Sequence, residues 1–188
     1  MSNNDENIYI YKEKNTTGFE IHQILNDSSD DVETVDITGD GQYILGIAYN
    51  RKALLYHYEN STEQFEIFQT INLSTNTSHY CHGGAITDDH QWMVAGVSNK
   101  LEVFTFNESI NEFTLNETIN DITGNVKHIS LTNDHSFMAV STERDYVYIY
   151  KYNGSSFVKS QTFQFDSKNP ERAFLSDDHQ HLIMSEDV

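Results

Sequence analysis

Short runs of apolar and aromatic residues recur along the whole chain and predict β-strands rather than helices. In the run 146–150 (Tyr-Val-Tyr-Ile-Tyr), β-branched and aromatic residues alternate, which suits a pleated, half-buried surface. No long run has the 3.6-residue period of an amphipathic helix, and the chain contains a single Pro. The pattern therefore predicts an all-β protein.

A hairpin-like motif occurs four times. In each copy an apolar residue is followed by Thr or Ser, two residues later by Asp, then by Gly or His, and then by a second apolar strand. The copies occupy residues 37–45, 86–94, 131–139 and 175–183. Gly41 supplies the positive φ that such a turn needs, whereas His in the other three copies adopts it with some strain. The recurring Asp residues are interpreted as turn residues, because no loop gathers the several carboxylates that calcium requires.

A second family of segments interleaves with these hairpins. Each member is a strand rich in Tyr, Ile, Leu or Phe, followed by a polar turn and a further strand that begins at Phe. The paired segments are 7–11 with 19–25, 53–58 with 65–71, 101–106 with 113–119, and 146–150 with 157–163. The repeat unit is therefore four strands long.

Antiparallel units of four strands that recur about every 40–50 residues are typical of β-propeller blades. The Thr/Ser-x-Asp-Gly/His-x-aromatic turn, followed one strand later by a Tyr-Ile-Tyr type strand, resembles the blade repeat of WD-repeat propellers. Tyr-Lys, Tyr-Glu or Phe-Asn stands where that family has Trp-Asp, and no regular Gly-His opens the blade. The resemblance is therefore to a divergent WD-repeat-like β-propeller, and it covers residues 1–188 as a single domain.

The phase of the repeat divides the chain into three whole blades and two halves. The third and fourth strands of a blade come first, and the first two strands of another come last. The expected units are a half-blade at 7–25, blades at 32–71, 81–119 and 126–163, and a half-blade at 171–184.

Three arrangements of the chain are compatible with a half-blade at each end. The two halves could pair within one chain and close a four-bladed ring, or pair between two chains in a homodimer with an eight-bladed ring. Alternatively, the chain could be a fragment of a longer propeller. We favour a closed arrangement because the two ends are complementary and an unpaired blade edge invites aggregation.

The charge narrows the choice of partners. The 188 residues carry 29 Asp and Glu against 11 Lys and Arg, which gives a formal charge of −18. This balance argues against nucleic acid and against an anionic membrane surface, and it favours basic protein partners. A single Cys excludes an internal disulfide framework. No secretory signal and no apolar run long enough to span a membrane are evident, so a cytoplasmic protein is expected.

Residues 79–82 hold the densest group of soft metal ligands in the chain. In a strand, His79 and Cys81 would share one face and His82 would lie on the other. Zinc needs about four converging ligands, and the chain offers neither a second Cys nor a second cluster. We therefore predict no metal site and no cofactor. Motifs for a nucleophile elbow, a phosphate loop or a zinc protease are also missing, so no catalytic residue is predicted.

The resemblance to WD-repeat-like propellers implies a non-catalytic protein–protein interaction scaffold, as a subunit or domain of a larger assembly. Two alternatives come from other classes: a glycan-binding or small-ligand-binding propeller, and a hydrolase with its site at the channel mouth. Identical pockets on each blade would favour a lectin. A single cluster of unlike polar residues at one channel mouth would favour an enzyme.

Overall fold

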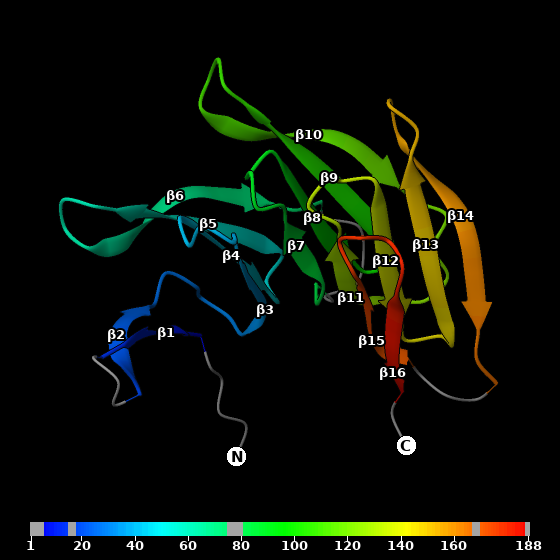
Figure 1. Cartoon of the computed structure of the whole chain (residues 1–188), viewed down its shortest axis with the longest axis horizontal. Helices are drawn as coiled ribbons and strands as arrows, with labels where there is room; N and C mark the ends of the chain where they lie inside the picture. Colours follow the sequence, from blue (N-terminus) through cyan, green and yellow to red (C-terminus); the bar gives the residue numbers. More distant parts are fainter. Residues whose placement is uncertain (1–5, 15–17, 75–80, 167–169, 187–188) are drawn as a thin grey trace.

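The structure of the protein is a computed structural model that describes residues 6–14, 18–74, 81–166 and 170–186 (Figure 1). Every regular element in these ranges is a β-strand, and the strands form three four-stranded and two two-stranded antiparallel sheets. The predicted all-β class with repeated four-stranded antiparallel sheets is thus confirmed. Over the same ranges there is no helix of the length and apolar character that crossing a membrane requires.

The sheets follow one another along the chain, and within each four-stranded sheet consecutive strands are neighbours. The two-stranded sheets are β1 (Ile8–Glu13) with β2 (Phe19–Leu25), and β15 (Pro170–Leu175) with β16 (Leu182–Glu186). The four-stranded sheets are β3 (Val32–Ile37), β4 (Tyr43–Ala48), β5 (Lys52–Glu59) and β6 (Gln64–Asn72); β7 (Gly84–Ile86), β8 (Trp92–Val97), β9 (Lys100–Asn107) and β10 (Glu112–Ile119); and β11 (Val126–Leu131), β12 (Phe137–Thr142), β13 (Tyr146–Tyr152) and β14 (Phe157–Gln164).

The turn between the first two strands of each blade is held by the Thr/Ser and Asp of the repeated motif. In the first copy the Thr38 hydroxyl donates to Asp40 Oδ1 at 2.6 Å, and the same oxygen accepts the N–H of Gln42 at 2.9 Å. The other copies repeat the hydroxyl contact, in the pairs Thr87–Asp89, Thr132–Asp134 and Ser176–Asp178. The turn has the expected positive φ, at Gly41 (69°), His90 (49°), His135 (49°) and His179 (60°).

The outermost strand of every blade contains a bulge at the same place. One extra residue interrupts the register, and the next residue is a Gln or Glu. The extra residues are His22, Phe68, Asn116 and Ser160, and the residues after them are Gln23, Gln69, Glu117 and Gln161.

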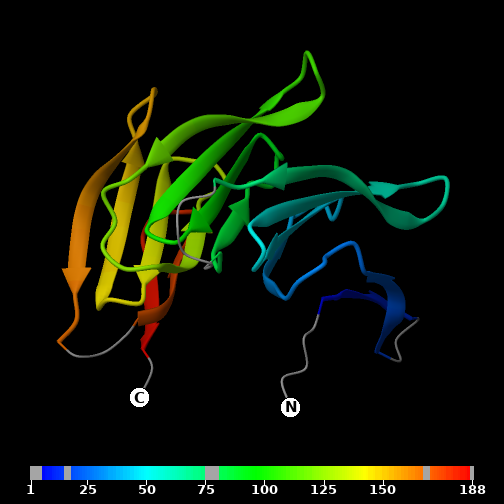
Figure 2. The ribbon, with the colours of Figure 1, turned by 180° about the vertical axis from the view of Figure 1, so that it is seen from behind.

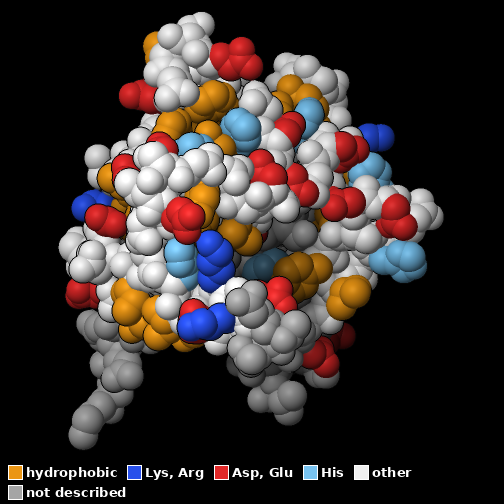
Figure 3. Space-filling view, turned by 60° about the vertical axis from the view of Figure 1, so that its left-hand side comes forward, with side chains coloured by type: hydrophobic (Ala, Val, Ile, Leu, Met, Phe, Trp, Pro, Cys, Tyr) orange, Lys and Arg blue, Asp and Glu red, His pale blue; other side chains and the backbone are white. Residues whose placement is uncertain are grey.

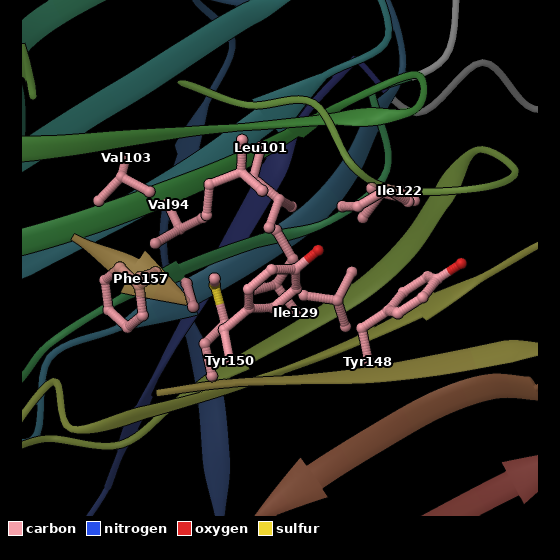
Figure 4. Close-up of a cluster of buried hydrophobic side chains, with 13 residues drawn as sticks. Val94, Leu101, Val103, Ile122, Ile129, Tyr148, Tyr150 and Phe157 are labelled. Carbon is pink, nitrogen blue, oxygen red and sulfur yellow. The ribbon is translucent and has the colours of Figure 1, made fainter. Parts of the chain in front are cut away.

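The apolar core lies between neighbouring blades. Figure 4 shows the largest cluster, in which Leu101 and Val103 of one blade meet Tyr150 and Phe157 of the next. A second cluster joins the sheet of β3–β6 to that of β7–β10, and smaller clusters attach the two terminal two-stranded sheets. Because every interface joins sequential blades, the chain forms a curved stack of sheets.

The two terminal half-blades do not pair with each other in this structure. The sheets β1–β2 and β15–β16 are separate, and Figures 1 and 2 show them at the two ends of an arc. The expectation of a composite blade within one chain is therefore corrected. At two of the blade interfaces a large side chain of one blade stacks on a His of the next, Tyr43 on His90 and Trp92 on His135. The stacked sheets form an open arc in this structure.

Candidate functional site

The concave side of the arc is formed by the first strand of each blade. Strands β3, β7, β11 and β15 line a groove with a volume of about 760 Å³. Because each of these strands belongs to a different sheet, the groove collects side chains from segments that are far apart in the sequence.

One rim of the groove is built from bulges on the inner strands. Glu33, Lys127 and Glu171 each occupy a register shift near the start of their strand, and His82 stands at the equivalent place just before β7. A bulge leaves one residue outside the ladder and changes the direction of its side chain. The four residues therefore reach the same rim although their strands belong to four sheets.

These rim residues form two pairs, each between a carboxylate and a nitrogen-containing side chain. His82 Nδ1 lies 3.1 Å from Glu33 Oε2, and the Lys127 ammonium forms an ion pair with the Glu171 carboxylate. The Thr34 hydroxyl donates to the carbonyl of His82 and so fixes the backbone beside the first pair. Each pair joins two neighbouring blades, so this rim holds the blades together and also exposes polar groups to the groove.

The opposite rim carries a chain of hydrogen bonds between the turns. The residue after the turn Thr or Ser accepts the backbone N–H of the equivalent residue one blade earlier: Asp88 Oδ1 from Gly39 at 2.5 Å, Asn133 Oδ1 from Asp88 at 3.0 Å, and Asp177 Oδ1 from Asn133 at 2.9 Å. The Asn133 amide also donates to both carboxylates, at 2.7 Å and 2.9 Å. This neutral side chain thereby separates two negative charges.

Acidic side chains dominate the lining of the groove. It contains six carboxylates but only two cationic side chains, which are Lys127 and Arg172. Figure 3 shows one face of the molecule on which acidic side chains are widespread and basic ones are few. Burial raises the pKa of Asp36, although backbone N–H donors from Ile86 and Ile37 oppose this effect. A cationic group entering the groove would relieve the repulsion among these carboxylates.

A second histidine, His128, lies in the wall of the groove rather than at its rim. Its Nδ1 lies 3.1 Å from the carbonyl oxygen of Ala173, and its ring packs on Phe174 with centroids 4.5 Å apart. Burial lowers the pKa of His128, and the nearby Arg172 acts in the same direction. The imidazole is therefore neutral at pH 7 and contributes no positive charge to the groove.

The structure separates the residues that the sequence singled out as metal ligands. Cys81 is fully buried in the core between two blades, and burial raises the pKa of its thiol to about 12. His82 lies on the groove side beside Glu33, and His79 falls outside the described residues. No group of three or more His, Cys, Asp or Glu side chains in the described ranges could hold a metal ion.

Sequence reasoning missed Glu33, Lys127 and Glu171 of this rim and considered His82 only as a metal-ligand candidate. Their signal is positional: Glu33, His82, Lys127 and Glu171 all stand five residues before the Thr or Ser of the repeated turn. Glu33, Lys127 and Glu171 each look like an isolated surface residue in their own segments. Only the alignment of the four turns brings them to one register position, and only the inner bulges show that they share a rim.

Comparisons with known proteins show the fold alone. No protein-family model matches the sequence, and no curated protein matches it. A protein from Lactobacillus plantarum has a similar crystal structure, with a TM-score of 0.77 and 12% sequence identity. The match covers 95% of this chain and 57% of that one, so the chain spans little more than half the length of its neighbour. That neighbour has a β-propeller-like fold, which agrees with the repeated four-stranded sheets described above.

Proposed function

We propose that the protein is a non-catalytic, WD-repeat-like interaction module that binds a basic segment of a partner protein in its concave groove. The observation that carries the proposal is the groove lining, in which side chains from four blades supply an excess of carboxylates. A lysine-rich or arginine-rich segment complements such a surface, and long-range attraction would speed its association.

The geometry also argues for a protein segment over a repeated small ligand. A lectin of this architecture would present the same pocket on every blade, whereas the four equivalent rim positions hold Glu33, His82, Lys127 and Glu171. The groove runs across several blades, which suits an extended chain. Loops and strand ends at such a surface supply specificity, while the packed blades behind them supply rigidity.

Binding of a fluorescent basic peptide tests the proposal. We expect a twelve-residue Lys/Arg-rich peptide to bind more tightly than an acidic peptide of equal length, with an affinity that falls as salt is added. Combining Glu33→Gln with Glu143→Gln removes two groove charges isosterically and should weaken binding by about two- to tenfold.

The matched control combines Glu108→Gln with Glu112→Gln, which removes two exposed charges around the β9–β10 turn, outside the groove lining. This control should bind the basic peptide nearly as tightly as the unmodified protein, apart from the small effect of net charge. Equal weakening by both double variants would show that the peptide responds to the net charge of the protein and not to the groove. Equal binding of the basic and acidic peptides would contradict the proposal.

A second candidate function is a hydrolase with its site at the channel mouth. The observation that favours it is the cluster of unlike polar residues on the bulged rim, where the His82 imidazole faces the Glu33 carboxylate. Such a pair can orient an imidazole as a general base. Turnover of a chromogenic ester that is abolished by His82→Ala would support this candidate, while turnover unaffected by that substitution would reject it.

A further inference from the structure

A cleft separates the outer strands of the blade β3–β6 and the blade β7–β10. It has a volume of about 460 Å³ and is lined by parts of β6, β9 and β10 together with Ser74. Among the described residues that line it, the one charged side chain is Glu102, which is 3% exposed. None of these residues lines the concave groove, so the cleft is separate from it.

The Glu102 carboxylate is buried with little compensation for its charge. Its two oxygens share one donor, the N–H of Ser74, at 3.1 Å and 3.3 Å. In the described ranges, the ion pairs of Lys side chains are all made with other carboxylates. The equivalent positions of the neighbouring blades hold Leu54 and Tyr148, so the blade itself does not require a charge here. Because an ionised carboxylate is costly to bury without a cation, Glu102 is suited to a cation supplied by a ligand.

The next interface along the chain shows how this architecture holds a cation. The equivalent of Leu115 in the next blade is Lys159, because each is the last residue before the bulge of its outer strand. The Lys159 ammonium lies over the Tyr148 ring, 4.3 Å from its centroid, and 3.1 Å from Asp121 Oδ2. At this interface the chain therefore places its own ammonium beside Tyr148, the residue equivalent to Glu102.

The cleft beside Glu102 receives no such ammonium from its own outer strand. Leu115 stands in the place of Lys159, and its side chain is 54% exposed at the cleft. Glu102 stands in the place of Tyr148, so the ring that carries the Lys159 ammonium is replaced by a full negative charge. One interface thus supplies its own lysine, whereas the other supplies a carboxylate and an open space.

We propose that this cleft binds a lysine side chain of a partner protein, with the ammonium at Glu102 and the methylene groups along Leu115 and Ile71. The bound side chain takes the place that Lys159 occupies at the next interface. Its methylene groups cover apolar surface while its ammonium reaches the carboxylate. An arginine fits less well, because the Ser74 N–H already lies between the two oxygens that a guanidinium fork would engage.

Leu115→Lys tests the cleft without any partner, because it gives β10 the ammonium that Lys159 provides in the next blade. We expect the urea midpoint of unfolding to rise by about 0.3–1 M. A positive charge can stabilise a protein of charge −18 by itself, so the control is the same substitution combined with Glu102→Gln. The rise should then be smaller than the rise that Leu115→Lys gives beside the native Glu102. An equal rise in both backgrounds, or no rise, would overturn the proposal.

A peptide with a single lysine tests binding from outside. The probe is a fluorescein-labelled pentapeptide with lysine between two leucines and a glycine at each end. Glu102→Gln keeps an oxygen for the Ser74 N–H but removes the charge, and it should weaken binding by about tenfold. Leu115→Lys should abolish binding, since it fills the cleft. In the unmodified protein, the amide resonance of Ser74 should shift when the peptide is added.

Two control ligands separate the ammonium from the rest of the probe. The same peptide with an acetylated lysine lacks the charge and should bind at least about tenfold more weakly. n-Butylamine carries the ammonium without a peptide and should also bind more weakly. Equal binding of the acetylated peptide would contradict the role of Glu102, and equal binding of n-butylamine would reject a protein partner in favour of a small amine. Binding too weak to detect at about 1 mM peptide would reject the site altogether.

The groove variant distinguishes this proposal from the proposed groove function. Glu33→Gln combined with Glu143→Gln should leave binding of the single-lysine peptide unchanged, because neither residue lines the cleft. If that double variant weakens binding as much as Glu102→Gln does, the lysine binds in the groove and the cleft is rejected. Failure of the twelve-residue basic peptide would instead reject the groove function and leave the cleft untouched.

Discussion

Gln69 of one blade holds the backbone of Phe113 in the next blade with both atoms of its amide. The Phe113 N–H donates to Oε1 at 2.8 Å, and Nε2 donates to the Phe113 carbonyl at 3.1 Å. Replacing the bulged strand's Gln by any apolar residue would leave both backbone groups without this partner at a partly buried interface. The contact therefore sets the spacing of two blades at their outer edge.

Gln69→Ala should lower the free energy of unfolding by about 1–3 kcal/mol, because two backbone polar groups lose their partner. Urea unfolding measures the loss. Gln164→Ala, at an exposed position near the end of β14, is the control and should stay within about 0.5 kcal/mol of the unmodified protein. Equal stability of the two variants would show that the hydrogen bonds between Gln69 and Phe113 do not contribute to the free energy of unfolding.

Glu117→Gln should stabilise the protein by about 0.5–1.5 kcal/mol. Glu117 accepts the Phe157 N–H at 3.0 Å, but an ionised carboxylate cannot donate to the Phe157 carbonyl as the equivalent Gln69 amide does to Phe113. The substitution supplies an amide N–H that can donate to the Phe157 carbonyl. Urea unfolding at pH 7 measures the gain, with the exposed Glu112→Gln as control. A destabilised Glu117→Gln variant would contradict this reading of the repeat.

Gly96→Ala should destabilise the protein by about 1–3 kcal/mol, since the added Cβ would lie 2.5 Å from Val126 Cγ1 of the next blade. Combining it with Val126→Ala tests the cause. If the clash is responsible, the double variant will lose less free energy of unfolding than the two single variants together. Strictly additive losses would assign the effect of Gly96→Ala to the backbone instead.

Acidification from pH 7 to pH 5 should lower the free energy of unfolding, in part through His128. Its pKa in the folded protein is lowered by burial, whereas the unfolded chain has the ordinary value of 6.5. The unfolded state therefore binds the proton first, and stability that is full above pH 6.5 is lost as the pH falls toward the folded pKa. Urea unfolding at the two pH values should show a smaller loss in His128→Gln. An equal loss in both proteins would exclude this contribution.

The repeated turn explains how much of the fold could be predicted. Thr38, Asp40 and Gly41 form a local hydrogen-bonded unit whose requirements lie within a few residues, so its four copies are visible in the sequence. The apolar strands around it have the short period of a pleated sheet. Local chemistry thus determines the antiparallel sheets and their order.

Bulges explain why the groove could not be found in the same way. Strict alternation assigns a face to every strand residue, and an extra residue such as Lys127 breaks that assignment without changing the local composition. The pairs His82–Glu33 and Lys127–Glu171 each join residues more than forty positions apart. Only the stacking of the sheets decides which of these distant residues meet.

The sequence by itself determined the all-β class, the four-stranded unit, the turn conformation and the acidic charge, because each depends on composition or on neighbours along the chain. The tertiary structure alone decided the curvature of the arc, the burial of Cys81 between two blades and the pairing of His82 with Glu33. These depend on which side chains of neighbouring sheets pack against one another. Packing between sheets is a property of residues far apart in sequence, so its outcome is settled only when the blades stack.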